Sequence, residues 1–89
     1  MSFGIETPAK YAKEDVERML AALDDRDAYG FVLRAKGVLQ LPAGGWMEFD
    51  YVPGEAQIRE DAKADVTGKI VVIGTELNER ALEDLFRNR

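Results

Sequence analysis

A long alternation of apolar and polar residues is the feature that most constrains the fold. Within residues 28–41, small or apolar side chains occupy every second position from Phe31 onward. Because successive side chains of a strand point to opposite faces of a sheet, this period of two predicts a long strand with one face in the core. The predicted core-facing residues are Phe31, Leu33, Ala35, Gly37, Leu39 and Leu41.

A second strand is predicted to return beside the first. Residues 42–45 read Pro-Ala-Gly-Gly, a sequence typical of a turn, and residues 46–52 alternate again. This arrangement predicts an antiparallel hairpin. One face of the return strand carries Met47, Phe49 and Tyr51, and the other carries Trp46, Glu48 and Asp50.

Three further strands are predicted from shorter signals. Residues 2–6 alternate in polarity, and residues 56–60 follow the turn sequence Val-Pro-Gly-Glu. Residues 69–74 contain the run Ile-Val-Val-Ile, which is typical of a strand buried on both faces of a sheet. The polar residues 61–68 predict a loop between the last two strands.

Two amphipathic helices complete the predicted pattern. The first covers residues 13–25, and the second follows Asn78, a favourable N-cap residue. Their apolar faces consist of Val16, Met19, Leu20 and Leu23 in the first helix and Ala81, Leu82, Leu85 and Phe86 in the second. The order β-α-β-β-β-β-α predicts a single α+β domain with a mainly antiparallel sheet. We expect both helices to pack on the sheet face lined by Phe31, Leu33 and Leu39.

The composition restricts the chemistry that the chain can perform. Its 89 residues include no cysteine and no histidine, which removes the commonest nucleophiles, bases and zinc ligands. A net charge of −5 disfavours nucleic acid and anionic membranes as partners. No apolar run approaches the ~20 residues of a membrane span, and the first residues do not resemble a signal peptide. We therefore predict a cytoplasmic chain with no catalytic, cofactor-binding or metal-binding residues.

Charged side chains on the predicted hairpin allow two interpretations. Arg34 and Lys36 lie two positions apart and share a sheet face, which points to an acidic partner. Alternatively, they pair across the hairpin with Glu48 and Asp50 on a solvated face. The two carboxylates could themselves form an acid–base pair if they were buried. Trp46 shares their predicted face, either as an interface residue or as a side chain packed over the turn.

Several segments in a fixed order carry a family resemblance. Residues 34–39 read Arg-Ala-Lys-Gly-Val-Leu, and a Trp-led strand that ends in Val-Pro-Gly follows at 46–54. Residues 68–74 form an apolar strand that ends in Ile-Gly, and a closing helix with Leu82 and Phe86 comes after it. This ordered set, together with the opening residues 2–7, resembles the C-terminal domain of the CobW family of P-loop GTPases.

The resemblance implies a domain without the active centre of its family. CobW-family proteins are GTPases linked to cobalamin biosynthesis and to metal delivery, and their phosphate loop and metal motif lie in an N-terminal domain. Residues 1–89 would be the C-terminal domain alone, while GTP and a divalent metal would be cofactors of the full-length parent. The chain would then be a non-catalytic accessory domain in partner binding or GTPase regulation.

The resemblance also suggests where partners bind. The partner would be the GTPase domain of the same protein or a client protein, with Arg34, Lys36, Trp46 and Tyr51 as contact residues. An apolar patch exposed without that neighbour would let the isolated domain self-associate. Two alternatives remain open: a stand-alone interaction module with an acidic surface, and a small enzyme that uses Lys36, Glu48 and Asp50 in a deep pocket.

Overall fold

The computed structural model describes residues 1–60, 62–63 and 67–87, and these residues form one five-stranded antiparallel sheet and three helices. The order across the sheet is β1-β5-β2-β3-β4. The strands are β1 (Ser2–Thr7), β2 (Phe31–Gln40), β3 (Trp46–Val52), β4 (Glu55–Arg59) and β5 (Gly68–Thr75), and the helices are α1 (Lys13–Ala22), α2 (Arg26–Tyr29) and α3 (Glu79–Arg87). The predicted α+β class and antiparallel sheet are confirmed. Residues 61 and 64–66 of the predicted loop lie outside the described residues.

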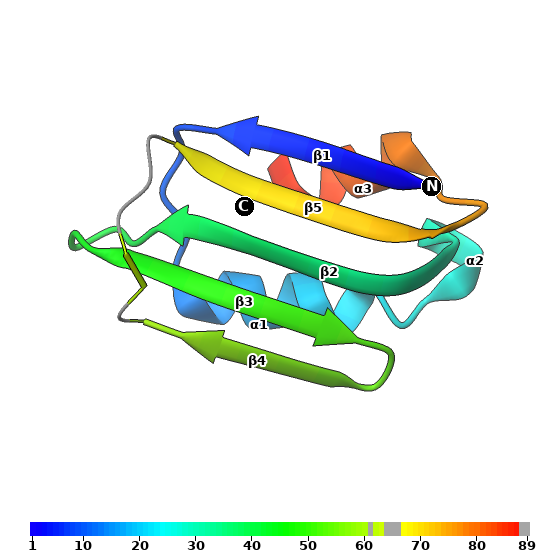
Figure 1. Ribbon diagram of the computed structural model, residues 1–89, viewed down its shortest axis with the longest axis horizontal. Helices are drawn as coiled ribbons and strands as arrows, with labels where there is room; N and C mark the ends of the chain where they lie inside the picture. The colour runs from blue at the N-terminus through cyan, green and yellow to red at the C-terminus, as the bar shows by residue number, and fades with distance from the viewer. Residues whose placement is uncertain (61, 64–66, 88–89) are drawn as a thin grey trace.

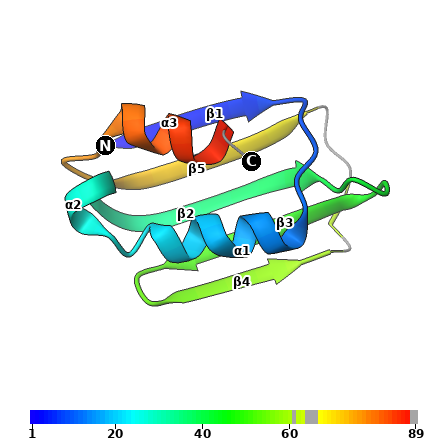
Figure 2. The same cartoon turned by 180° about the vertical axis from the view of Figure 1, so that it is seen from behind.

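The two longer helices lie on the same face of the sheet. In the view of Figure 1, α1 and α3 lie behind the strands, and the view from behind in Figure 2 brings both helices to the front. Within the described part of the chain, the opposite face carries no helix. The core therefore forms between one sheet face and the helices. Its largest fully buried side chains include Tyr11, Met19, Phe49 and Phe86.

A bulge reverses the orientation of the first residues of β2. Opposite β5, the register shifts between Val32 and Arg34, so that Leu33 is an extra residue without a partner. One extra residue turns the preceding side chains to the other face of the sheet. Val32 is consequently buried, whereas Phe31 and Leu33 are 44% and 53% exposed. The prediction that Phe31 and Leu33 line the core is wrong.

The apolar strand β5 is buried on one face only. Ile70 and Val72 point into the core and are fully buried. Val71 is half-buried, and Ile73 is 40% exposed on the opposite face. The prediction that this strand is buried on both faces is wrong, because both long helices pack on the same side of the sheet.

A short helix that the sequence pattern did not predict connects α1 to β2. The side chain of Asp25 accepts a hydrogen bond from the Ala28 N–H at 3.2 Å and caps this helix, α2. The predicted N-cap role of Asn78 is confirmed, because its Oδ1 accepts a hydrogen bond from the Ala81 N–H at 3.2 Å. Asn78 also donates to the Ala28 carbonyl, which ties α2 to the start of α3. Within the described residues, the longest helix has 10 residues, about half of what a bilayer-spanning helix needs.

Candidate partner-binding surface

The helix-free face of the sheet, called here the open face, brings together the charged residues that the sequence singled out. The Arg34 guanidinium donates hydrogen bonds to Asp50 Oδ1 from Nε at 3.3 Å and from Nη2 at 3.0 Å. The predicted cross-hairpin pairing is therefore confirmed for Arg34. Lys36 lies opposite Asp50 in the strand register but makes no ion pair with any described residue. It is the cation of this set that remains available to a partner.

The edge strand adds a charge that sequence reasoning missed. Arg59 of β4 lies opposite Glu48 and donates hydrogen bonds to its carboxylate, and its Nη2 lies 3.6 Å from Asp50 Oδ2. The signal was present in the sequence, because a tight turn after β3 fixes the register of β4. Arg34, Asp50, Arg59 and Glu48 thus form a continuous charged row across three strands.

Glu48 and Asp50 do not have the environment of a catalytic pair. Their side chains are 50% and 36% exposed, and arginine side chains already occupy both carboxylates. General acid–base catalysis usually depends on a carboxyl group shielded from water. The geometry favours the interpretation of a solvated outer face. Among the described residues, no three acidic side chains gather closely enough to hold a metal ion.

Apolar side chains flank the charged row at one end of the open face. Ile73 of β5 pairs with Arg34 of β2 in the register, and Val52 ends β3, which lies on the other side of β2. Both are large hydrophobic residues with about two fifths of their surface exposed, 40% for Ile73 and 43% for Val52. Trp46 is half-buried at the opposite end, where it pairs with Gln40 beside the hairpin turn. The candidate residues therefore lie at both ends of this face.

Tyr51 does not belong to the open face. Its side chain is 2% exposed and points to the helix side of the sheet, where its hydroxyl donates a hydrogen bond to Asp24 Oδ1 at 2.5 Å. The period of two already placed Tyr51 on the same face as Phe49, and the structure buries both. As a candidate contact residue, Tyr51 must therefore be replaced by exposed neighbours.

A cavity at the end of the sheet was also not predicted. It has a volume of about 390 Å³ and lies between the end of α1, the start of β2 and the turn after β3. Its apolar lining includes Leu23, Phe31, Leu33 and Pro53, and the Arg26 guanidinium lies 4.6 Å from the centre of the Phe31 ring. The bulge at Leu33 turns Phe31 and Leu33 out of the core, and both side chains line this cavity.

A carboxylate clamp holds the turn between β3 and β4 against the end of α1. Asp24 Oδ1 accepts hydrogen bonds from the Tyr51 hydroxyl and from the Gly54 N–H at 3.0 Å. These bonds, chiefly the one from Tyr51, hold the pKa of Asp24 below its ordinary value of 3.8. Burial, followed by the bond to Asp24, raises the pKa of Tyr51 above its ordinary value of 10.0. A lowered acid pKa stabilises the fold above about pH 4, and a raised tyrosine pKa stabilises it below about pH 10.

Replacing Tyr51 with phenylalanine is expected to remove one of the two hydrogen bonds of this clamp and to leave the bond from the Gly54 N–H. The free energy of unfolding at pH 7 should fall by about 1–2 kcal/mol, because a hydrogen bond between a buried hydroxyl and a charged group is lost. The difference from the unmodified protein should shrink as the pH falls below 4, where Asp24 becomes protonated in both proteins. Urea unfolding from pH 2 to pH 8 measures both effects. Tyr29→Phe is the control, and a pH-independent loss in Tyr51→Phe would contradict the assignment.

The fold defines the chain as a small α+β domain in which helices cover one face of the sheet and, among the described residues, leave the other face without a helix. The chain belongs to the family described as the cobalamin synthesis protein cobW C-terminal domain, which matches residues 1–89. The resemblance seen in the motifs is thereby confirmed. A search of curated protein sequences gives no match.

Two solved structures share this fold. One is the zinc-bound YjiA GTPase from E. coli, with a TM-score of 0.78 and 22% identity over 98% of this chain. The other is a zinc-bound triple mutant of YjiA, with a TM-score of 0.79 and 23% identity over the same share. This chain spans 28% of the length of either protein.

Proposed function

We propose that this chain is an accessory domain of a CobW-like GTPase and that its open face binds a protein partner. The GTPase domain of the same protein is the partner that the similarity to YjiA favours, because this chain corresponds to little more than a quarter of that protein. The observation that carries the proposal is the open face itself, where Ile73 and Val52 are exposed beside Arg34 and Lys36. Such a mixture of apolar and charged side chains is typical of a non-obligate interface.

The chemistry of this surface favours one kind of partner surface. Lys36 has no ion pair among the described residues, so a carboxylate of the partner can neutralise it without breaking an existing contact. Ile73 and Val52 gain free energy when a partner removes them from water. The cavity beside Phe31 and Leu33 has room for an apolar side chain at the end of the same interface. The proposed partner surface is therefore acidic at its centre and apolar at one end.

The proposed role is regulatory. GTP and a divalent metal would be bound by the GTPase domain, in cobalamin biosynthesis or metal delivery in the cytoplasm, and this domain would influence both ligands through the contact. Binding that differs between two states of a neighbouring domain shifts the equilibrium between them, typically by 5- to 150-fold in affinity. The residues of the open face would determine how strongly this domain binds each state of the GTPase domain, and they would not contact the nucleotide or the metal.

Reversing the surface chemistry of the open face should uncouple the two domains. In a protein that joins this domain to a CobW-type GTPase domain, the double variant Lys36→Glu and Ile73→Asp should change the GTP hydrolysis rate or metal affinity about fivefold or more. The matched control is Glu14→Lys, an exposed position on α1, on the helix-covered side of the sheet. Both substitutions lie on exposed positions, and thermal unfolding checks that the fold is retained.

Either result decides between two modes of action. A change in GTP hydrolysis or metal affinity that occurs in the open-face double variant but not in Glu14→Lys supports regulation within one protein. Hydrolysis and affinity that stay unchanged in this variant, and also after removal of residues 1–89, would contradict the proposal. The domain would then act as a stand-alone interaction module for a separate protein.

A further inference from the structure

The strand β4 forms a free edge of the sheet. It is the last strand in the order β1-β5-β2-β3-β4 and pairs only with β3 among the described residues (Figure 1). A free edge presents unpaired N–H and C=O groups that can pair with another strand. Natural edges are commonly protected by proline, a bulge or an inward-pointing charge. The sequence Glu-Ala-Gln-Ile-Arg of β4 contains no proline, its register with β3 has no shift, and its core-side residues are Ala56 and Ile58.

The hairpin geometry determines which backbone groups face outward. Val52 and Glu55 flank a two-residue turn and face each other as a hydrogen-bonded pair. Because pairs alternate along an antiparallel ladder, Gln57 and Arg59 also direct their backbone groups to β3. Ala56 and Ile58 consequently direct theirs to the free edge. The Trp46 carbonyl is consistent with this alternation, since it accepts a hydrogen bond from the Ala62 N–H on the β4 side of β3.

We propose that β4 pairs with β4 of a second copy of this chain, antiparallel and centred on Gln57. In this register Ala56 lies opposite Ile58 of the second copy, and the two resulting pairs use the outward backbone groups of both chains. Glu55 lies opposite Arg59 of the second copy on the open face, and the two-fold symmetry repeats this ion pair. The same five residues are thus complementary to themselves in backbone, charge and apolar character.

Arg59 can serve both the monomer and the dimer. A guanidinium has five donors in a planar fork, and Glu48 and Asp50 occupy only part of this capacity. Glu55 forms no ion pair with another described residue, so the dimer gives its carboxylate a partner. The other edge strand lacks this complementarity, since β1 centred on Gly4 would place Glu6 opposite Ser2.

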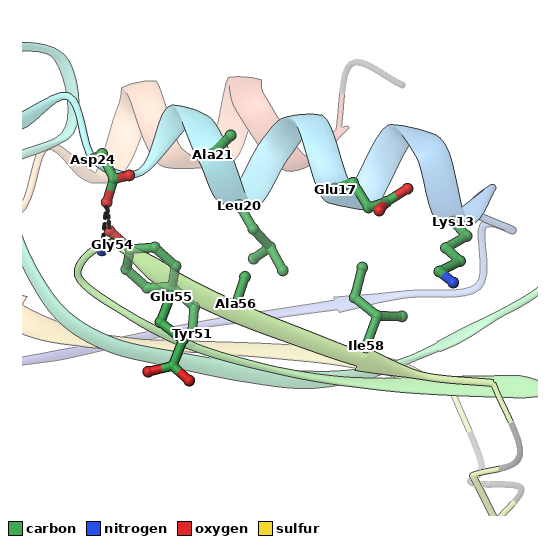
Figure 3. A pocket seen from close by; sticks show the side chains of 10 residues that line it. All are labelled: Lys13, Glu17, Leu20, Ala21, Asp24, Tyr51, Gly54, Glu55, Ala56 and Ile58. Atoms are coloured by element: carbon green, nitrogen blue, oxygen red, sulfur yellow. Dashed lines mark hydrogen bonds between the residues drawn. The ribbon is translucent and has the colours of Figure 1, made fainter.

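The helix beside β4 leaves room for the added strand. A groove of about 410 Å³ separates α1 from β4, and Figure 3 shows Leu20 and Ile58 pointing into it from opposite sides. Lys13 and Glu17 lie along its α1 wall. Pairing with a second β4 would add apolar surface to the strand side of the groove, because Ile58 of the second copy would lie beside Ala56. The short interface predicts a weak, transient dimer, which must be measured at high protein concentration.

Charge reversal distinguishes this dimer from other forms of self-association. Glu55→Arg alone places arginine opposite arginine twice, and Arg59→Glu alone places glutamate opposite glutamate twice. The dissociation constant of the dimer should be about tenfold higher for each variant than for the unmodified chain, because two favourable cross-strand pairs become repulsive. An equimolar mixture of the two variants should recover the unmodified affinity, because every pair is again opposite in charge. Sedimentation velocity across a concentration series measures the three dissociation constants.

A site-specific cross-link tests the register independently. Gln57 lies on the two-fold axis as a pair without backbone hydrogen bonds, for which Cα atoms are about 4.5 Å apart, within disulfide range. Because the chain contains no cysteine, Gln57→Cys gives a single thiol that should form a disulfide-linked dimer under mild oxidation. Ser2→Cys on the other edge strand is the control and should remain mainly monomeric.

Three outcomes would overturn the proposal. One is a monomer at all concentrations, and another is a dimer that is equally stable in Glu55→Arg and in Ala56→Pro, which blocks the free edge. The third is failure of the mixed variants to associate although circular dichroism shows that each is folded. Self-association that is abolished by Ile73→Asp but not by Glu55→Arg would assign it to the open face instead.

Discussion

Replacing Phe86 with alanine is expected to lower the free energy of unfolding by about 3–5 kcal/mol. Phe86 is fully buried near the end of α3, and its carbonyl accepts a hydrogen bond from the buried Tyr11 hydroxyl at 2.7 Å. The variant loses the burial of an aromatic ring and leaves a cavity in the core. A domain of this size has a total stability of roughly 4–13 kcal/mol, so the loss would bring it close to unfolding at 37 °C.

The neighbouring Leu85 provides the matched control for this prediction. Leu85 is half-buried on the same helix, so Leu85→Ala keeps the helix propensity and removes less buried surface. Leu85→Ala should lower the free energy of unfolding by about 1 kcal/mol. Urea unfolding followed by circular dichroism compares the two variants. Equal losses would contradict the larger packing contribution that full burial assigns to Phe86.

Replacing Gly37 with alanine is expected to destabilise the domain by about 1–3 kcal/mol. A Cβ atom at this position would overlap with the Lys69 carbonyl oxygen and would lie 2.6 Å from a carbon of the Phe49 ring. Both neighbours belong to the packed centre of the sheet, so neither can move without disturbing the core. The effect should be visible as a lower midpoint of urea unfolding with an unchanged slope.

Gly4 is the control for Gly37, because both glycines lie inside strands. The nearest atom to a Cβ at Gly4 would be the Ile70 carbonyl oxygen at 3.9 Å, an ordinary van der Waals contact. Gly4→Ala should therefore stabilise the domain slightly, by up to about 1 kcal/mol, since it reduces the freedom of the unfolded chain. The two substitutions are expected to change the free energy of unfolding in opposite directions. A stabilising effect of Gly37→Ala as well would contradict this prediction and would show that small shifts relieve the crowding around Gly37.

The glycines of the family motifs have a packing role in this domain. Gly37 closes the Arg-Ala-Lys-Gly segment, and Gly74 closes the apolar strand β5. A Cβ at Gly74 would overlap with the carbonyl oxygen of Phe31 and approach Leu77 Cδ2 to 2.9 Å. Both glycines therefore allow neighbouring backbone or side chains to approach the sheet closely.

The hairpin and the face of each residue in β3 could be predicted from the sequence. Met47 and Phe49 are buried, whereas Glu48 is exposed and Asp50 is half-buried, because a strict alternation with charged outer residues allows only one register. The cap at Asn78 was equally predictable, since its side chain acts on the adjacent helical turn. The hairpin placed Arg34 and Lys36 near Glu48 and Asp50, but the register sets Lys36 opposite Asp50, so the choice of Arg34 as the partner of Asp50 came from the structure.

The start of β2 could not be predicted, because its residues do not distinguish the two faces. Phe31, Val32 and Leu33 are all apolar, so a bulge can turn either set outward without changing the pattern. The burial of one face of β5 depends in the same way on helices elsewhere in the chain. The cavity beside Leu33 is lined by residues from separate parts of the chain, such as Leu23 and Pro53, so it exists only in the folded protein.

Local alternation and capping thus determined the five strands, the two longer helices and the solvent-exposed side of β3, because these depend on neighbours within a few residues. Tertiary structure alone decided that both long helices cover one face, that Asp24 meets Tyr51, and that β4 is an edge. Contacts between residues far apart in sequence depend on the packing of whole elements, which no local pattern encodes. The self-complementarity of Glu-Ala-Gln-Ile-Arg was visible in the sequence, but only the fold shows that one side of this strand pairs with no other strand among the described residues.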